Sequence, residues 1–203
     1  MKYKQYQKYK DSGVEWIGEI PEHWEVMKLF VVLTKKNKKN DDNVVRKMLS
    51  VSQTLGIVEK EYDSKSKIRT KDESLSYRVV EPVDLVVNNM WIQYRGLGVS
   101  FISGIVSPAY HVYKINSEKI DPRFLNFLVR SDLYVNEYKR YLTGIRPNSL
   151  QISSYDFTRL PLVLPSRKEQ EQIFDFLQNE LDNAGDIISK YQSQIKLLQE
   201  KRR

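Results

Sequence analysis

The sequence predicts a mixed α/β (α+β) globular domain over residues 1–165, followed by one long helix over residues 166–203 that forms a coiled coil. Three observations predict this architecture. The 203-residue chain is 40% hydrophobic and 11% aromatic, which is enough to fill one core. Short runs rich in β-branched and aromatic residues occupy the middle of the chain. The residues after 166 carry an apolar heptad pattern without proline.

Strands are expected in the middle of the domain, where turn-forming residues such as Pro82, Gly96, Gly98, Gly104 and Pro108 separate the apolar runs. The expected strands cover residues 48–51, 77–80, 85–87, 99–102, 110–115 and 159–164. One helix is expected over residues 122–142, with Asp121 as its N-cap and Gly144 beyond its end. The buried side of that helix is expected to carry Phe124, Leu125, Leu128, Tyr134, Tyr138 and Tyr141.

The C-terminal helix has a clear start signal. Pro165 ends the preceding strand, and Ser166 stands three residues before Glu169, the spacing of a capping box. An apolar seam then follows with spacings that alternate between 3 and 4: Phe174, Leu177, Leu181, Ala184, Ile188, Tyr191, Ile195 and Leu198. A helix over these 38 residues would extend about 57 Å, further than the domain itself. We therefore expect the seam to pair with another helix, since packing on its own domain favours a broader stripe.

The net charge of +7 comes mainly from residues 31–71, which carry eleven basic and five acidic side chains. A local basic excess suits a polyanion, because each Lys or Arg near a phosphate releases bound counterions. A solvated basic loop without a partner remains the alternative. The chain has no Cys and only two His, so thiolate zinc sites, disulfides and a His-only metal site are excluded. No apolar run is long enough to cross a bilayer and no secretory signal is visible, so we expect a cytoplasmic protein without membrane contact.

No catalytic residue can be nominated. Residues 107–110 read SPAY, one residue away from an amino-methyltransferase motif, but no glycine-rich turn follows a strand to hold S-adenosylmethionine. Asp63 and Lys65 have a nuclease-like spacing without the further carboxylate that a metal site needs. His23 is expected to pack or to cap a neighbouring group. The sequence therefore predicts a binding protein without a metal of its own.

Several stretches, in the same order along the chain, resemble the specificity subunits of Type I restriction-modification systems. They are YKDSGVEWIGEIPEHW (residues 9–24), GIVSPAY (104–110), GIR (144–146), LPLVLP (160–165) and EQEQI (169–173). The resemblance implies a non-catalytic target-recognition domain that reads double-stranded DNA and docks modification (methyltransferase) subunits, which two restriction subunits can join. It also implies that S-adenosylmethionine is held by the modification subunit and that this chain needs no cofactor.

The usual member of that family has two recognition domains and two long helices that pair antiparallel, whereas this chain has one of each. The resemblance therefore implies a half-length subunit that reads a half-site and pairs as an antiparallel homodimer. Two alternatives stay open: a fragment of a longer two-domain subunit, and a stand-alone dimeric DNA-binding regulator.

The DNA-contacting residues are predicted from side-chain chemistry alone. Amide side chains pair with adenine, guanidinium groups with guanine, and lysines with phosphates. The candidates are Lys65, Lys67, Arg69 and Lys71 in a basic segment, Asn89, Gln93, Tyr94 and Arg95 before a glycine turn, and Arg146 and Asn148 in a later loop. Trp91 is expected to pack in the core, because large aromatic side chains usually do.

Overall fold

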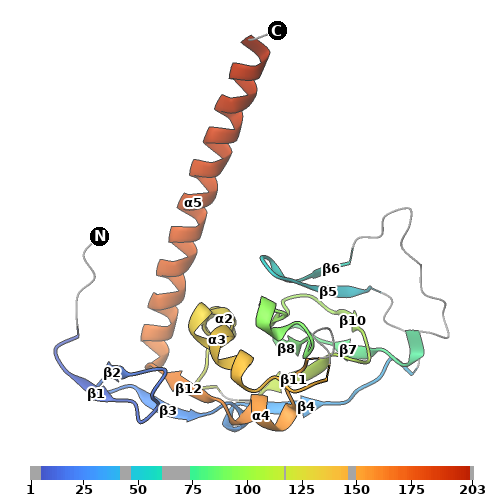
Figure 1. Ribbon diagram of the computed structural model, residues 1–203, viewed down its shortest axis with the longest axis vertical. Coiled ribbons are helices and arrows are strands. Elements are labelled where there is room, and N and C mark those ends of the chain that lie inside the picture. The colour runs from blue at the N-terminus through green and yellow to red at the C-terminus, as the bar shows by residue number, and fades with distance from the viewer. Residues whose placement is uncertain (1–5, 42–46, 61–73, 117, 146–149, 202–203) are drawn as a thin grey trace.

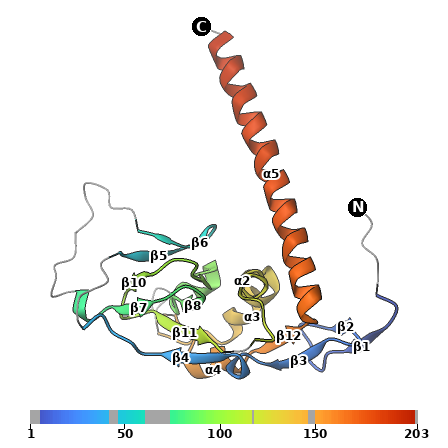
Figure 2. The same cartoon turned by 180° about the vertical axis from the view of Figure 1, so that it is seen from behind.

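The structure is a computed structural model that describes residues 6–41, 47–60, 74–116, 118–145 and 150–201. It consists of a body of short strands and helices from which a single long helix, α5 (Arg167–Lys201), projects (Figure 1). The same arrangement seen from behind shows α5 leaving the body beside α2 (Pro122–Arg130) and strand β12 (Pro161–Leu164) (Figure 2). The predicted mixed α/β fold with a long C-terminal helix is confirmed. No helix in the described ranges is both long and apolar enough to span a membrane.

The main sheet has four antiparallel strands in the order β4 (Leu33–Lys36), β11 (His111–Ile115), β8 (Asp84–Val87) and β9 (Leu97–Val99). Strand β8 is buried along its whole length, which explains its unbroken apolar run Leu85-Val86-Val87. Four two-stranded pairs surround this sheet, all antiparallel. They are β1 (Tyr9–Asp11) with β2 (Glu19–Pro21), β3 (Glu25–Lys28) with β12, β5 (Leu49–Ser52) with β6 (Gly56–Glu59), and β7 (Arg78–Val80) with β10 (Gly104–Val106).

The helix expected over residues 122–142 is instead two helices, α2 and α3 (Asp132–Arg140), and this prediction is wrong at the break. Ser131 lies between them in an extended conformation, with φ −64° and ψ 154°. The break turns α3 back toward α2, so that the buried Tyr138 hydroxyl donates a 2.7 Å hydrogen bond to the carbonyl of Val129. In an uninterrupted helix, Val129 and Tyr138 would lie nine positions apart along one axis, too far apart for this hydrogen bond. Tyr141, expected to be buried, lies beyond α3 and is exposed.

Other strand boundaries also differ from the prediction. The strand expected at 99–102 lies at Leu97–Val99, because the Ser100 hydroxyl bonds to the carbonyl of Ile102 and turns the chain. The strand expected from 159 begins at Pro161, since the preceding residues form helix α4 (Ser154–Arg159) with Ser153 as its N-cap. The described part of the body also contains two 3-10 helices, η1 (Leu29–Val31) and η2 (Ile92–Tyr94).

The core lies between the main sheet and helices α2, α3 and α4. Its largest buried side chains are Tyr113, Tyr134, Tyr138 and Phe157. The hydroxyls of the buried tyrosines are paired, and that of Tyr134 donates to the carbonyl of Pro161 at 2.9 Å. These bonds remove the cost of burying a polar group, so the tyrosines can pack as core residues.

The first turn of α5 forms hydrogen bonds with the N-terminal segment of the domain and with the residues next to α2 and β12. The capping box is confirmed: the Ser166 backbone N–H donates to Glu169 Oε2 at 3.1 Å, and the Glu169 N–H donates to Ser166 Oγ at 3.4 Å. The other oxygen of Glu169 also binds the ring nitrogens of His23, at 2.8 Å, and Trp24, at 3.3 Å. His23 therefore takes part in this cap from 146 residues away. Next to it, wholly buried Gln170 accepts from the Asp121 N–H and donates to the carbonyls of Lys119 and Pro165.

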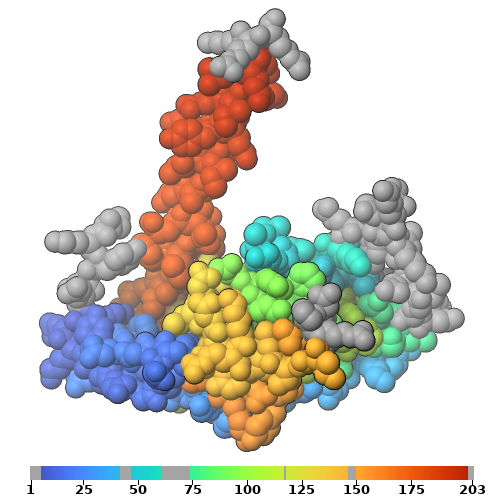
Figure 3. Space-filling view, viewed as in Figure 1, coloured from blue at the N-terminus to red at the C-terminus, as the bar shows by residue number. Residues whose placement is uncertain are grey.

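Beyond its first three turns, α5 stands clear of the body (Figure 3). Phe174 and Leu177 are half-buried against the body, while every residue from Asn179 to Glu200 is exposed. Five larger seam residues have exposed fractions between 55% and 62%: Leu181, Ile188, Tyr191, Ile195 and Leu198. The seam is thus an unpartnered apolar stripe within this chain, and its pairing in a coiled coil stays a prediction.

The cap at Glu169 predicts a loss of stability in acid. Burial would raise the pKa of this carboxyl, but hydrogen bonds from Ser166, His23 and Trp24 outweigh it and lower the pKa to about 2. A depressed pKa stabilises the fold above the unfolded value of about 4.5, and that contribution disappears as the pH falls from about 4.5 to about 2. We expect it to amount to roughly 1–2 kcal/mol, because the group lies near the surface.

Urea unfolding between pH 6 and pH 3 tests this expectation with the Glu169→Gln variant. Glutamine keeps the capping geometry but does not titrate, so stability should depend less on pH than in the wild type. Glu171→Gln is the control, because Glu171 is exposed and forms its hydrogen bond with Arg167 on the same helix. Equal pH dependence in the wild type and both variants would contradict the role of Glu169.

Candidate nucleic-acid interface

A tight loop between β8 and β9 carries four of the predicted DNA-contacting residues. Its ends are closed by the Asn88 N–H bonding to the Gly96 carbonyl at 2.7 Å, and by the Gly96 N–H bonding to the Trp91 carbonyl at 3.0 Å. A Cβ at position 96 would lie 2.4 Å from the Trp91 carbonyl oxygen, so only glycine fits there. Arg95 adopts a left-handed conformation with φ 56°, which is costly for a non-glycine residue.

Trp91 and Tyr94 lie on the surface of this loop, with exposed fractions of 59% and 51%. The expectation that Trp91 packs in the core is therefore wrong. Turn η2 buries Ile92 in its place and leaves Trp91 and Tyr94 exposed. The two aromatic rings contact each other at a centroid distance of 5.4 Å. Together with Val51 and Gln53 of the β5–β6 hairpin, the two rings line a cavity of about 280 Å³ between the loop and the hairpin.

Asn89 and Gln93 point inward. Asn89 is buried, and its amide nitrogen lies 3.0 Å from Nδ1 of His111. Burial, with the charges of Lys35 and Arg78, lowers the pKa of His111 to about 4. The His111 ring is therefore neutral at pH 7 and can accept a hydrogen bond from the Asn89 amide. Within the described residues, Oε1 of Gln93 is buried without a hydrogen-bond partner.

Arg95 is held by two groups at the junction of α2 and α3. Its Nε donates to the carbonyl of Arg130 at 3.2 Å, and its Nη2 forms an ion pair with Asp132. Roles in DNA contact stay predictions for Asn89, Gln93, Tyr94 and Arg95. The other candidates, Lys65, Lys67, Arg69, Lys71, Arg146 and Asn148, lie outside the described residues.

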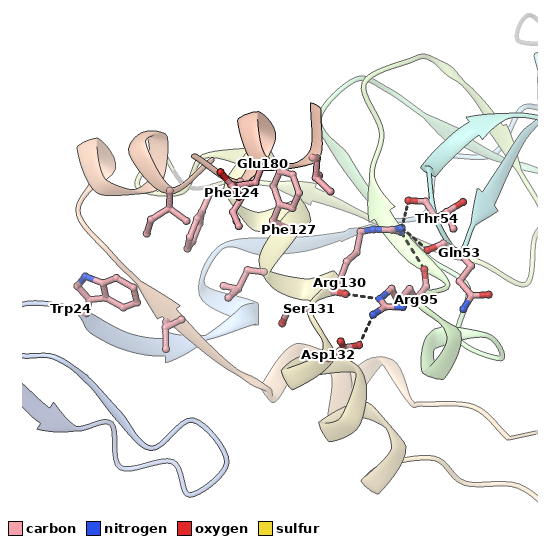
Figure 4. A pocket seen from close by; sticks show the side chains of 15 residues that line it. Trp24, Gln53, Thr54, Arg95, Phe124, Phe127, Arg130, Ser131, Asp132 and Glu180 are labelled. Atoms are coloured by element: carbon pink, nitrogen blue, oxygen red, sulfur yellow. Dashed lines mark hydrogen bonds and ion pairs between the residues drawn. The ribbon is translucent and has the colours of Figure 1, made fainter. Parts of the chain in front are cut away.

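Arg130 at the end of α2 joins the loop to the hairpin, a role that no sequence pattern indicates. Its guanidinium donates to the carbonyls of Gln53 at 2.9 Å and Thr54 at 3.2 Å in the hairpin turn, and to that of Arg95 at 3.2 Å (Figure 4). It also donates to the carbonyl of Leu97 and, at 3.5 Å, to that of Ser52. One side chain thus satisfies carbonyls from two separate segments and fixes them relative to each other.

A groove of about 850 Å³ lies between α5, α2 and the hairpin turn. Its walls are mainly apolar, with the two arginines and Asp132 at the end nearest the hairpin (Figure 4). The apolar lining comprises Trp24, Phe124, Phe127, Leu128, Val163, Ile173, Leu177 and Leu181. Three of these, Ile173, Leu177 and Leu181, belong to α5, and Leu177 and Leu181 are seam residues. The exposed seam therefore runs directly into the groove.

No group of three or more His, Asp or Glu side chains within the described ranges is arranged to hold a metal ion.

The position of Arg130 predicts that its loss loosens the hairpin. Replacing Arg130 by Met keeps the length of the side chain but leaves several carbonyls without a donor. We expect a loss of about 2–4 kcal/mol in the free energy of unfolding. Amide hydrogen exchange should also become faster at the hairpin turn and in the 88–96 loop than elsewhere. Lys139→Met on the exposed side of α3 is the control; an equal effect of both substitutions would contradict the role of Arg130.

No protein-family model and no curated protein sequence matches this chain. Solved structures do match it. A chain from a structure of the type I R-M system, described for its assembly and conformational transition, has 17% identity and a TM-score of 0.59. The HsdS subunit from Thermoanaerobacter tengcongensis has 16% identity and a TM-score of 0.58. The match covers 83% of this chain and 44% of each of those chains.

The S subunit of the Type I restriction-modification system from M. genitalium also matches, at 9% identity and a TM-score of 0.51, over 82% of this chain and 41% of that one. This chain thus spans less than half the length of the solved chains that it resembles. Its body and projecting helix have the fold of Type I restriction-modification specificity subunits.

Proposed function

We propose that this chain is the sequence-specific DNA-recognition subunit of a Type I restriction-modification complex. In this role it is not a catalyst: it reads a half-site with its body and docks methyltransferase subunits, which restriction subunits can join. The observation that carries the proposal is the shared fold of body and projecting helix over 83% of the chain. S-adenosylmethionine would be bound by the modification subunit and not by this chain.

The proposal includes an antiparallel homodimer formed through α5. The seam residues beyond Leu177 are exposed, and an exposed apolar stripe of this length is typical of an interface. The chain spans less than half of the solved subunits, and we propose that a second copy supplies the helix that pairs with α5. A two-fold dimer places two identical bodies on DNA, so its target is a gapped palindrome.

The loop and hairpin around Trp91 and Tyr94 are the proposed DNA-facing surface. Two exposed aromatic rings beside a turn held rigid by Arg130 are suited to contact bases or sugars, while the basic segment 31–71 supplies charge for phosphates.

The dimer is tested by replacing two exposed seam residues. Ile188→Glu with Ile195→Glu should give a folded monomer, since neither side chain contacts the body, whereas the wild type should be a dimer at micromolar concentration. Light scattering after size exclusion measures the mass. Ser189→Glu with Ser193→Glu adds the same charge off the seam and should leave the dimer intact. A monomeric wild type would contradict the homodimer and favour a fragment of a two-domain subunit.

DNA reading is tested by selection from random duplexes, followed by methylation mapping in cells that also make a Type I modification subunit. The expected result is one gapped palindrome, enriched by the complex and methylated on both strands. The Ile188→Glu, Ile195→Glu variant should lose the palindrome. Tight specific binding without the modification subunit, and no methylation with it, would favour a stand-alone regulator. Binding of S-adenosylmethionine by the isolated chain, measured by calorimetry, would contradict a non-catalytic role.

A further inference from the structure

The charges of α5 are divided between its two halves. Residues 169–186 carry six carboxylates and no Lys or Arg, whereas residues 187–203 carry five basic side chains and one carboxylate. Within the described residues, no ion pair involves Glu180, Lys190 or Lys196. Two such helices repel each other when parallel and attract each other when antiparallel, because each acidic half then faces a basic half.

The seam also selects a register. Its spacings read the same in both directions, so an antiparallel copy matches all eight positions only when the two-fold axis lies beside Asp186. That register pairs Phe174 with Leu198, Leu177 with Ile195, Leu181 with Tyr191, and Ala184 with Ile188. A shift by one heptad leaves two seam positions of each helix without a partner.

This register explains one exposed residue outside the seam. Ile187 is 56% exposed and has no contact with the body, and it would lie beside the two-fold axis next to its own copy. Leu197, which is 58% exposed, would face away from the second helix. In the dimer, Leu198 would therefore be buried and Leu197 exposed, although the two adjacent side chains have similar exposed fractions in the single chain.

In this register, the C-terminal end of the second helix would lie at the groove. Leu177 and Phe174, the partners of Ile195 and Leu198, sit at the base of α5 beside α2, and Phe127 of α2 packs against Phe174 at a ring distance of 5.7 Å. The groove is about 850 Å³ and mainly apolar, which suits the last two turns of an apolar seam.

We propose that the groove between α2 and α5 is a socket for residues 191–198 of α5 from a second copy, with the two-fold axis beside Asp186. The proposal rests on the homodimer proposed above and adds its register and the occupant of the groove. It makes the recognition body itself part of the dimer interface.

Disulfide trapping tests the register, because the chain has no cysteine of its own. Leu177→Cys with Ile195→Cys should give a covalent dimer under mild oxidation; the two positions of one chain are about 27 Å apart along the helix and cannot join within it. Leu177→Cys with Ile188→Cys would be trapped instead if the register were shifted by one heptad. Leu177→Cys alone would be trapped by a parallel pair. In a protein that is dimeric by light scattering, a register shifted by one heptad would overturn the socket and leave the antiparallel homodimer standing. A parallel pair would overturn both.

The occupant of the groove is tested with adjacent leucines. Leu198→Asp should raise the dimer dissociation constant about tenfold or more, and Leu197→Asp should leave it nearly unchanged. Neither residue contacts the body, so both variants should keep the wild-type circular dichroism of the body. Phe127→Ala in the groove wall should weaken the dimer too, and by less when Leu198 is already replaced. Equal effects of the two aspartates, or additive effects of Phe127→Ala and Leu198→Asp, would overturn the proposal.

Discussion

The buried amide of Gln170 is the contact on which the rest of the structure depends. Its three hydrogen bonds join the first turn of α5 to the cap of α2 and to the end of β12. Beside it, Glu169 bonds to His23 and Trp24 in the N-terminal segment. These bonds fix both the direction in which α5 leaves the body and its rotation about its own axis. The lower end of the seam, at Leu177 and Leu181, therefore lines the groove.

A second fixed point is Arg130, which holds the hairpin turn and the 88–96 loop by their carbonyls. Backbone carbonyls are available whatever the neighbouring side chains are. The surface residues of the loop and the hairpin could therefore change without loss of this support. In the proposed DNA-facing surface, the residues that hold the backbone are thus separate from the residues that would contact DNA.

Local sequence signals predicted the parts of the fold that local physics controls. The capping box at Ser166 and Glu169, the strand at 85–87 and the long helix all depend on neighbouring residues. The signals failed where a distant group decides the conformation. The break at Ser131 is stabilised by the contacts of Tyr138. Trp91 is exposed because the neighbouring Ile92 occupies the core in its place. Short strands such as β1, β2 and β10 have three residues each, too few for a periodic pattern. The groove joins residues of the N-terminal segment, α2 and α5, and no local pattern could assemble it.

The exposed length of α5 has a consequence for the fate of the chain in a cell. A helix that bonds to its own domain only through its first turns gains little stability from that domain, and isolated helices are marginal in water. Its far end would fray until it is covered, and a frayed apolar segment is a good substrate for proteases and chaperones. A copy without a partner would thus be cleared faster than an assembled one. The same helix that we propose as a dimer interface would act as a degradation signal that assembly conceals, and the amount of the protein would follow the amount of complete complex.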